Sequence, residues 1–572
     1  MHRPTDTALT RRTFVRHAVA GAAGLWVVSD PLLSRALAAV PGASDVAFAQ
    51  GVASGQVDEG AATLWTHLTG IDRPTRLGVE VASDPGFANV VARTQALADP
   101  ASGGSARVRI GGGSLRPGER YWYRFETADG ESSPVGRLRL APPPGSAEPI
   151  KIAFFACQDF LVGNYAAHRD LALQEADLVV CLGDYIYEQA FFEGSVRNVP
   201  VTPDGSVRTF DEYRAQYATY HADANLRAVR ASAPLVSIWD DHEVEDNYAG
   251  ELPGGQSRRA GARPIPFLER RASGYRAFFE AMPVVRDPTD PDRTSGATRF
   301  GQVDLLALDT RRFRTDQPCN PKDSFLSLCT TGAAPTRRTS ATLLGTPQRE
   351  WLIDRLRTST APWKLIANQV MAMSLDLIPG VPLNTDAWDG YAYERSLICD
   401  AITKHGVEDV AFFTGDIHTF FAGTVTRTGR QSSLWIDGLK RGQPVATELV
   451  VGSVTSQGIA DRFAKNEGQR NAAAKVLDPI IKGPNAHLRY SNSAYKGYGI
   501  ATATVGELRV EFRAVRDPRD AASEVFSLAK FVVPRGRATV ERVASGPVAP
   551  AQGRGPSAEQ ATRALREFTA AH

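Results

Sequence analysis

The stretch from Asp177 to Glu188 reads DLVVCLGDYIYE, and this stretch decides the fold. A near-continuous apolar strand runs straight into a glycine and then into polar and aromatic side chains. Strands that are apolar on both faces are typical of a sheet that is covered on both sides, as in layered α/β domains. Similar apolar strands recur at residues 151–155, 235–239, 304–308, 363–367 and 407–413, with helical stretches between them. The sequence therefore predicts an α/β domain over residues 149–533.

Polar side chains follow most of these strands at their carboxyl ends. They comprise a thiol, a phenol, two imidazoles, three carboxylates and two amides: Cys157, Tyr187, His242, His418, Asp184, Asp241, Asp416, Asn247 and Asn368. Taken singly, most of them are better explained by turns, solvated loops or core packing. In an open α/β sheet, however, the carboxyl ends of the strands line one crevice, and many carboxylates cannot stay ionised together without cations. The ordered series therefore predicts a multi-metal centre.

The segments on either side of this domain have a different pattern of apolar, polar and turn-forming residues. Residues 46–142 are rich in turns and alternate between apolar and polar side chains, as in Ala62–Thr66, which predicts a small all-β sandwich of the immunoglobulin or fibronectin kind. The run from Pro142 to Gly145 reads as a linker. Residues 534–572 are predicted to form a tail that is irregular up to residue 555. Ser557 then caps a short helix with Ala561, Leu565 and Phe568 on one face, either frayed or docked over a site.

Composition excludes several classes of protein. The chain has 572 residues, of which 43% are hydrophobic and 22% charged, so it can bury a large core and is not disordered. Lysine and arginine number 65 against 63 acidic residues, a net charge of +2. That balance gives no general cationic surface for nucleic acid, and we expect no specific nucleic-acid binding.

The amino terminus has the pattern of an export signal. Arg11 and Arg12 precede a mildly apolar run at residues 18–28, and Ala36-Leu37-Ala38 supplies a cleavage pattern of small residues. This arrangement resembles a twin-arginine signal, so residues 1–38 are predicted to be removed and the twin-arginine translocase to be a partner. About eleven apolar residues are too few to cross a bilayer core, which needs about 20, so no transmembrane anchor is expected. We predict a secreted protein, or a periplasmic or cell-envelope one.

Five cysteines are distributed along the chain: Cys157, Cys181, Cys319, Cys329 and Cys399. Outside the cytoplasm, Cys319 and Cys329 could close a short surface loop as a disulfide. The odd count leaves at least one thiol unpaired, and Cys157 is the one that lies among the polar clusters.

Several motifs together resemble one family. They are residues 183–188 (GDYIYE), 239–243 (WDDHE), 308–311 (LDTR), 388–391 (WDGY) and 415–418 (GDIH), with 48–55 and 64–66 in the amino-terminal part. In these motifs the chain resembles the PhoD-type alkaline phosphatase/phosphodiesterase family, a branch of the calcineurin-like metallophosphoesterases, over nearly its whole mature length. The resemblance implies a layered metallophosphoesterase-type β-sandwich flanked by helices.

The same resemblance implies a role for each predicted ligand. Fe³⁺ would be held by Cys157, Asp184, Tyr187 and His418, since thiolate and tyrosinate favour the ferric state. Asp184 would bridge to Ca²⁺, whose other candidate ligands all offer oxygen: Asp241, Asn368, Asp416 and Asn247. The family often has two asparagines where this chain has Asp246-Asn247. That departure leaves the number of calcium ions open.

Three further side chains could each have either a catalytic or binding role or a structural one. His242 follows a predicted ligand directly, which suits it to stabilise the transition state or to protonate the leaving group, although it could instead be a structural histidine. Arg311 and Arg312 could hold a phosphate bidentately or form ordinary salt bridges. Both alternatives remain open from the sequence.

The predicted function is a secreted metal-dependent phosphatase and phosphodiesterase that uses a metal-activated water. One alternative is a phospholipase D-like enzyme acting on phospholipids or envelope polymers. It predicts an apolar rim at the crevice, for which the pairs Phe191-Phe192 and Phe420-Phe421 are candidates. An alternative from another class is an exported binding protein with a degenerate metal site.

Overall fold

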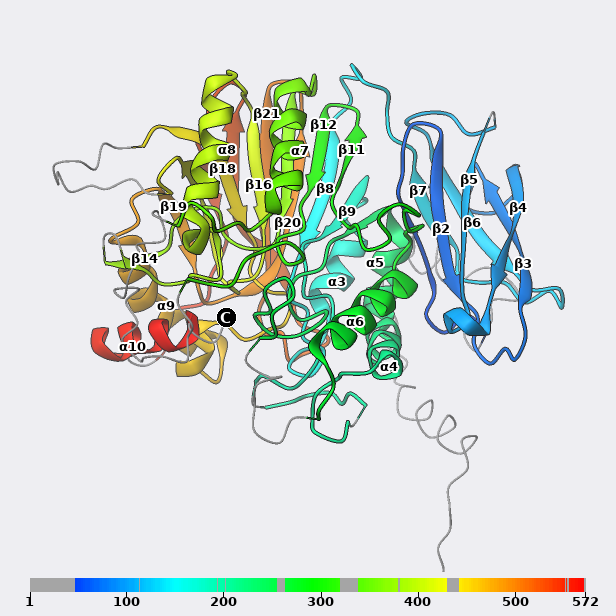
Figure 1. Cartoon of the computed structure of the whole chain (residues 1–572), viewed down its shortest axis with the longest axis horizontal. Helices are drawn as coiled ribbons and strands as arrows, with labels where there is room; N and C mark the ends of the chain where they lie inside the picture. Colours follow the sequence, from blue (N-terminus) through cyan, green and yellow to red (C-terminus); the bar gives the residue numbers. More distant parts are fainter. Residues whose placement is uncertain are drawn as a thin grey trace, which may run out of the picture. The chain divides into compact units, whose positions relative to one another are not determined.

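The computed structural model describes residues 47–112, 114–192, 194–200, 202–254, 263–318, 338–378, 381–429, 442–550, 552 and 555–569 (Figure 1). Two seven-stranded sheets form the larger part. The order in the first is β10 (Leu235–Ser237), β9 (Leu178–Cys181), β8 (Ile150–Phe155), β20 (Lys496–Ala503), β21 (Glu507–Val515), β22 (Val525–Pro534) and β23 (Glu541–Ser545). The order in the second is β11 (Gly296–Phe300), β12 (Val303–Ala307), β13 (Trp363–Asn368), β16 (Val410–Thr414), β18 (Pro444–Val450), β17 (Phe420–Thr426) and β19 (Leu488–Asn492).

The core between the two sheets explains why the strands read as near-continuous apolar runs. In β16, Phe413 belongs to the cluster between the sheets, and its ring stacks on that of Phe154 of β8 with 4.2 Å between centroids. Its neighbour Phe412 belongs instead to the cluster shared with α7 (Gly345–Thr358) and α8 (Ala392–Lys404). Because successive side chains of a strand alternate between faces, both faces are buried. The predicted layered α/β fold, a β-sandwich flanked by helices, is confirmed.

Helices cover the outer faces of both sheets. Against the first sheet pack α3 (Ala166–Ala172), α4 (Phe210–His221), α5 (Ala224–Ser232) and α6 (Phe267–Ala281), and their apolar faces share one cluster with β8, β9 and β10. The chain sets the start of two of these helices locally. Thr209 forms a capping box with Glu212 at α4, and Asp223 accepts two backbone N–H groups at α5.

An all-β region precedes the main part, as predicted. One of its sheets has the order β1 (Val52–Gly55), β2 (Ala61–His67), β5 (Ser105–Gly111), and the other β4 (Val90–Ala98), β3 (Thr75–Ala82), β6 (Arg120–Glu126), β7 (Gly136–Arg139). Figure 1 draws these strands in blue. In β6 the tyrosine and phenylalanine side chains are buried and the residues between them are not, which is the alternation read from the sequence.

The carboxyl-terminal tail differs from its prediction. Residues 534–555 were expected to be irregular, but β23 pairs antiparallel with β22 and extends the first sheet. The expectation was wrong because all five residues of β23 are exposed, so this edge strand carries no burial alternation. Helix α10 (Ala558–Thr569), which follows β23, packs against α9 (Glu467–Lys482) and the 3₁₀ turn η5 (Ile459–Phe463). Its Ala561 and Leu565 are buried. The terminal helix is therefore docked rather than frayed.

Some sequence predictions concern residues outside the described ranges. The export signal at residues 1–38 and the possible Cys319–Cys329 disulfide both lie there. Of the five cysteines, Cys157, Cys181 and Cys399 are described, and all three are buried free thiols. The limits of the predicted domains stay predictions. No helix within the described ranges is both long enough and apolar enough to span a membrane.

Candidate metal centre

Most of the predicted ligands sit on strained backbone in the loops that follow the parallel strands. Five of them have a positive φ, between 52° and 67°: Cys157, Asp184, Asn247, Asp416 and His418. Only nine non-glycine residues in the described ranges share this conformation. Left-handed backbone is uncommon for residues with a side chain and tends to cluster at functional sites. The strain therefore marks these loops independently of their side-chain chemistry.

One group of side chains brings the two sheets together. Ligand atoms of Cys157 and Asp184, which follow strands of the first sheet, and of His418, which follows β16, lie within 4.8 Å of one another, all buried. The hydroxyl of Tyr187 lies 3.2 Å from Oδ2 of Asp184 and 3.3 Å from Nε2 of His418. Ions such as zinc hold N, O and S ligands at about 2.0–2.3 Å, so two ligands of one ion lie at most about 4.6 Å apart. The ligand atoms therefore lie close to the separations that one shared cation requires.

A second group shares Asp184 with the first. Ligand atoms of Asp184, Asp241 and His242 also lie within 4.8 Å of one another, and all three side chains are buried. Asn247 adjoins this group, since its backbone N–H donates to Oδ2 of Asp241 at 2.6 Å. The carboxylate of Asp184 is thus common to both groups, which is the arrangement that a bridging ligand requires.

Asp416 and Asn368 lie on the second sheet. The backbone carbonyl of Asp416 accepts a weak hydrogen bond from the Cys157 thiol at 3.9 Å. The side-chain amide of Asn368 donates to Thr414 at 3.2 Å, and its Oδ1 accepts from Nε1 of Trp388 at 3.1 Å. These contacts fix Asn368 at the end of β13, while its place beside a cation stays a prediction.

The chemistry of the donor set fits a bound cation. Burial, reinforced by neighbouring carboxylates, raises the pKa of four acidic groups well above their ordinary values: Cys157, Tyr187, Asp184 and Asp416. A cation among them would favour the thiolate, phenolate and carboxylate forms instead. Oδ1 of Asp184 and Oδ2 of Asp416 are buried and have no hydrogen-bond partner in the described part of the chain. Since buried polar atoms are nearly always paired, these oxygens suit metal ligation.

His242 is held by a residue that the sequence analysis missed. Its Nδ1 lies 2.8 Å from Oε2 of Glu188, and its ring stacks on Tyr187 with 4.2 Å between centroids. Burial alone would lower the pKa of His242, but the carboxylates of Asp241, Asp184 and Glu188 raise it well above its usual value. With Nδ1 engaged, Nε2 is the nitrogen that can face a substrate.

Two more residues that the sequence analysis missed come from the loop after β18. Oγ of Ser456 lies 2.8 Å from the hydroxyl of Tyr187, and the backbone carbonyl of Gln457 lies 2.9 Å from Nδ1 of His418. The signal was present in the sequence, because this loop is a further polar cluster at the end of an apolar strand. Its serines, threonine and glutamine are not typical metal ligands, so the sequence alone does not indicate a metal site there.

The salt-bridge alternative holds for both arginines. Arg311 is fully buried and pairs with Asp240, Asp241 and Asp386, with 2.7 Å between its Nη2 and Oδ2 of Asp386. Arg312 pairs with Asp290 at 2.7 Å. A guanidinium with such partners is not available to hold a phosphate. Instead, Arg311 ties the loop that carries Asp241 to the loop of Asp386.

Of the two candidate aromatic pairs, one lies in the core and one at the site. Phe420 and Phe421 are completely or almost completely buried in β17, so they form no apolar rim. Phe191 and Phe192 are partly buried. Their rings contact those of His242 and His418 respectively.

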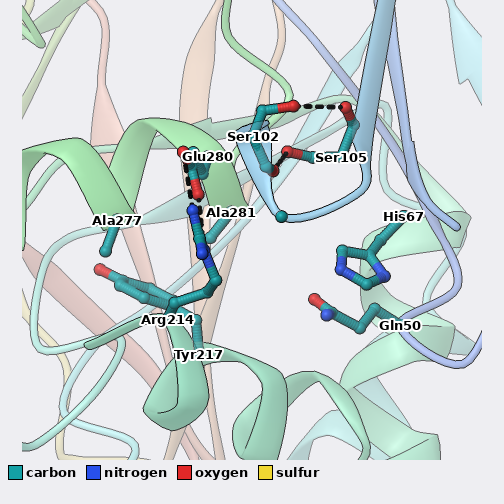
Figure 2. A pocket seen from close by; sticks show the side chains of 10 residues that line it. Gln50, His67, Ser102, Ser105, Arg214, Tyr217, Ala277, Glu280 and Ala281 are labelled. Atoms are coloured by element: carbon teal, nitrogen blue, oxygen red, sulfur yellow. Dashed lines mark hydrogen bonds and ion pairs between the residues drawn. The ribbon is translucent and has the colours of Figure 1, made fainter. Parts of the chain in front are cut away.

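Two cavities elsewhere contain none of the predicted ligands. Figure 2 shows the smaller one, of about 20 Å³, between His67, Gln50, Tyr217 and the ion pair of Arg214 with Glu280. That volume holds a single water molecule. The larger cavity, of about 500 Å³, adjoins β10 and β12, and its lining likewise excludes all eight predicted ligands and His242. Neither cavity belongs to the metal centre.

Comparison with known proteins identifies the family. The profile of the PhoD-like phosphatases matches residues 152–512, and that of their N-terminal domain matches residues 34–142. The chain belongs to the PhoD-like phosphatase family. It is 32% identical over 561 residues to alkaline phosphatase D of Bacillus subtilis (strain 168), covering 94% of this chain and 90% of that protein. The PhoD resemblance is confirmed, and the chain is a phosphoric ester hydrolase.

Solved structures agree with this family. A structure of PhoD superimposes with a TM-score of 0.77 at 28% identity, covering 93% of this chain and 99% of its own. A purple acid phosphatase from yellow lupin (Lupinus luteus) seeds gives 0.51 at 13% identity, covering 85% and 74% respectively. The second likeness concerns the fold alone. These comparisons favour the enzyme over the binding-protein alternative.

Proposed function

We propose that this PhoD-like phosphatase is a secreted, metal-dependent alkaline phosphatase and phosphodiesterase with an Fe³⁺/Ca²⁺ centre. One observation carries the proposal. The buried group of Cys157, Asp184 and His418, with the Tyr187 hydroxyl against it, shares Asp184 with a second buried group, which contains Asp241 as a candidate Ca²⁺ ligand and His242 as the candidate acid. Two cation sites joined by one carboxylate suit the hydrolysis of phosphate esters.

The donor types support a different cation at each site. Thiolate and tyrosinate from Cys157 and Tyr187 are anionic donors that favour Fe³⁺. The remaining candidate ligands offer only oxygen, which suits Ca²⁺: Asp241, Asn247, Asn368 and Asp416. The carboxylate of Asp416 also favours a hard cation over a zinc-like ion.

Each residue of the site would have its own role in the hydrolysis of the phosphate ester. Bound cations would polarise the phosphoryl oxygens and lower the pKa of a water molecule. Glu188 holds Nδ1 of His242, so that Nε2 faces the substrate and can give a proton to the departing alkoxide oxygen. Ser456 holds the Tyr187 hydroxyl in position, and the backbone carbonyl of Gln457 holds the ring of His418 in position. Substrates are phosphomonoesters and phosphodiesters.

The test is metal content and visible absorption of the purified mature enzyme, together with turnover of p-nitrophenyl phosphate and bis(p-nitrophenyl) phosphate. We expect about one iron per chain, a charge-transfer band in the visible region and loss of turnover on calcium chelation. Tyr187→Phe should remove the tyrosinate contribution to the band and leave the contribution of the Cys157 thiolate. Tyr185→Phe is the matched control, because that buried hydroxyl pairs with Arg230 instead and should leave the band unchanged. A colourless, zinc-containing active enzyme would overturn the ligand assignment.

Secretion has its own test. Replacing both Arg11 and Arg12 with lysine preserves the charge of residues 1–38 but removes the arginine pair. We expect the doubly substituted precursor to stay in the cytoplasm, measured by cell fractionation and immunoblotting. Export of that precursor at the normal level would refute the twin-arginine route.

A further inference from the structure

The segment after β9 places two aromatic rings beside the two histidines of the metal centre. The ring of Phe191 lies edge-on to that of His242, with 4.5 Å between centroids. The ring of Phe192 lies edge-on to that of His418 at 6.0 Å. The two phenylalanine rings are 6.5 Å apart. They thus span the two halves of the centre, since His242 and His418 belong to the two groups joined by Asp184.

These rings do not have the environment of core side chains. Both are only partly buried and pack at the edge of the cluster between the sheets, whereas the neighbouring Tyr187 is 1% exposed. A phenylalanine ring offers no hydrogen bond, so neither ring can bind the phosphoryl group or a cation ligand in a directed way. What remains is partly exposed aromatic surface next to a site that is otherwise lined by charged and polar side chains.

We infer that Phe191 and Phe192 form an aromatic wall that recognises the organic part of the substrate. The inference rests on the proposed function and specifies its substrate class: phosphate esters whose alcohol component has a flat apolar or aromatic face. A group that departs as His242 protonates its oxygen would do so beside the ring of Phe191, which packs against that imidazole. Stacking on such a face stabilises an aryl or nucleoside group but does little for a small hydroxylated one.

The experiment compares two monoesters that differ in the alcohol: p-nitrophenyl phosphate and glycerol 3-phosphate. Phosphate release is measured for the wild type, Phe191→Ala, Phe192→Ala and the double variant. We expect kcat/KM for the aryl ester to fall about tenfold, mainly through KM, and to change less than twofold for glycerol 3-phosphate. Comparing each variant with the wild type cancels the intrinsic difference between the two leaving groups.

Controls separate the possible outcomes. Phe313→Ala removes a partly exposed ring that Arg312 covers, and should change neither substrate. If Phe191 only packs His242 in place, both esters will lose activity equally, which overturns the inference and leaves the proposed function standing. A wild-type enzyme that hydrolyses neither ester overturns both. Phe191→Leu keeps apolar volume without the flat ring, and provides the same comparison if the alanine variant does not fold.

Discussion

Glu188 and His242 are buried together, 2.8 Å apart, and Glu188 also accepts the backbone N–H of Asp246 at 2.9 Å. One carboxylate therefore orients an imidazole and ties down the loop that follows it. The sequence predicted the histidine from its position next to a carboxylate, but nothing in the sequence pairs it with Glu188, which lies 54 positions away. Side-chain partners of this kind depend on tertiary structure.

Glu188→Gln tests this orientation. Glutamine keeps the volume but loses the charge that favours a proton on Nδ1, so we expect kcat to fall about 10- to 100-fold. The measurement is kcat and KM for p-nitrophenyl phosphate, with bound metal determined in parallel. Glu394→Gln is the matched control, because that buried carboxylate accepts backbone N–H groups at the start of α7 and should affect stability alone. An unchanged kcat for Glu188→Gln would show that the pair has no part in turnover.

Two other histidines make the fold sensitive to acid. Burial, and to a lesser degree Arg197, lowers the pKa of His168 to about 3, and burial with Arg230 lowers the pKa of His221 well below its usual value. The unfolded chain, with histidine pKa values of about 6.5, therefore binds more protons between these limits. The contribution of these two histidines to the free energy of unfolding is fully present above about pH 6.5. It falls as the pH drops toward the pKa of the folded state, by up to about 1.4 kcal/mol per pH unit for each histidine.

The measurement is the free energy of unfolding by denaturant at several pH values from 8 to 4. His168→Gln removes one titrating group, so the slope between pH 6 and pH 4 should decrease by about one proton. Carboxylates also titrate in this range and affect both proteins alike, which is why the difference in slope is compared. Equal slopes in the two proteins would contradict a neutral buried His168.

At the scale of elements, a strand could be predicted from the sequence only where its burial in the fold requires a recognisable pattern of apolar residues. Strands such as β16 were found because both of their faces are buried, while β23 was missed because its five residues are all exposed. Among site residues, Cys157 and Asp184 were found through their position after such strands. Arg311 could be named but not assigned, since its three carboxylate partners come from distant loops.

The end of α6 depends on an arginine from the amino-terminal β region. Helix ends leave their last carbonyls without partners in the helix. Arg107 of β5 donates to two of these carbonyls, those of Phe279 and Glu280, and at 3.1 Å to the carbonyl of Met282, which directly follows the helix. Arg107→Ala should leave them without this partner and lower the free energy of unfolding by about 1–3 kcal/mol.

Denaturant unfolding of Arg107→Ala and Arg109→Ala measures this effect. Arg109 lies two residues further along the same strand and pairs with the exposed Asp58, so its loss should cost less than about 1 kcal/mol. Equal effects of the two substitutions would show that the α6 contact contributes no special stability.

At the scale of the whole molecule, the candidate metal centre lies where two sheets meet. Cys157 and Asp184 come from the first sheet and His418 from the second, yet their ligand atoms lie within 4.8 Å of one another. The sequence predicted that the strand ends would converge, because parallel strands bring their carboxyl ends to one edge. It could not predict that this edge would be shared by two sheets, since sheet membership depends on pairings such as β8 with β20, about 350 residues away.

Metal removal should therefore weaken the whole fold. A ligand that binds only the native state stabilises it by about 4 kcal/mol at a thousand times its dissociation constant. We expect the chelated wild type to unfold at a lower temperature in calorimetry, and to regain its stability when iron and calcium are restored. Asp184→Asn should lose this gain, because the shared carboxylate is gone.

The sign of the Asp184→Asn effect should reverse without metal. Burial and the nearby carboxylates of Asp241 and Asp240 raise the pKa of Asp184, so an ionised Asp184 is unfavourable when no cation is bound. Asparagine has nearly the same shape and no charge, and should leave the chelated protein at least as stable as the chelated wild type. With metal restored, the order should invert and the wild type should unfold at the higher temperature. If Asp184→Asn were less stable than the wild type under chelation as well, Asp184 would serve the fold through its hydrogen bonds rather than through a bound cation.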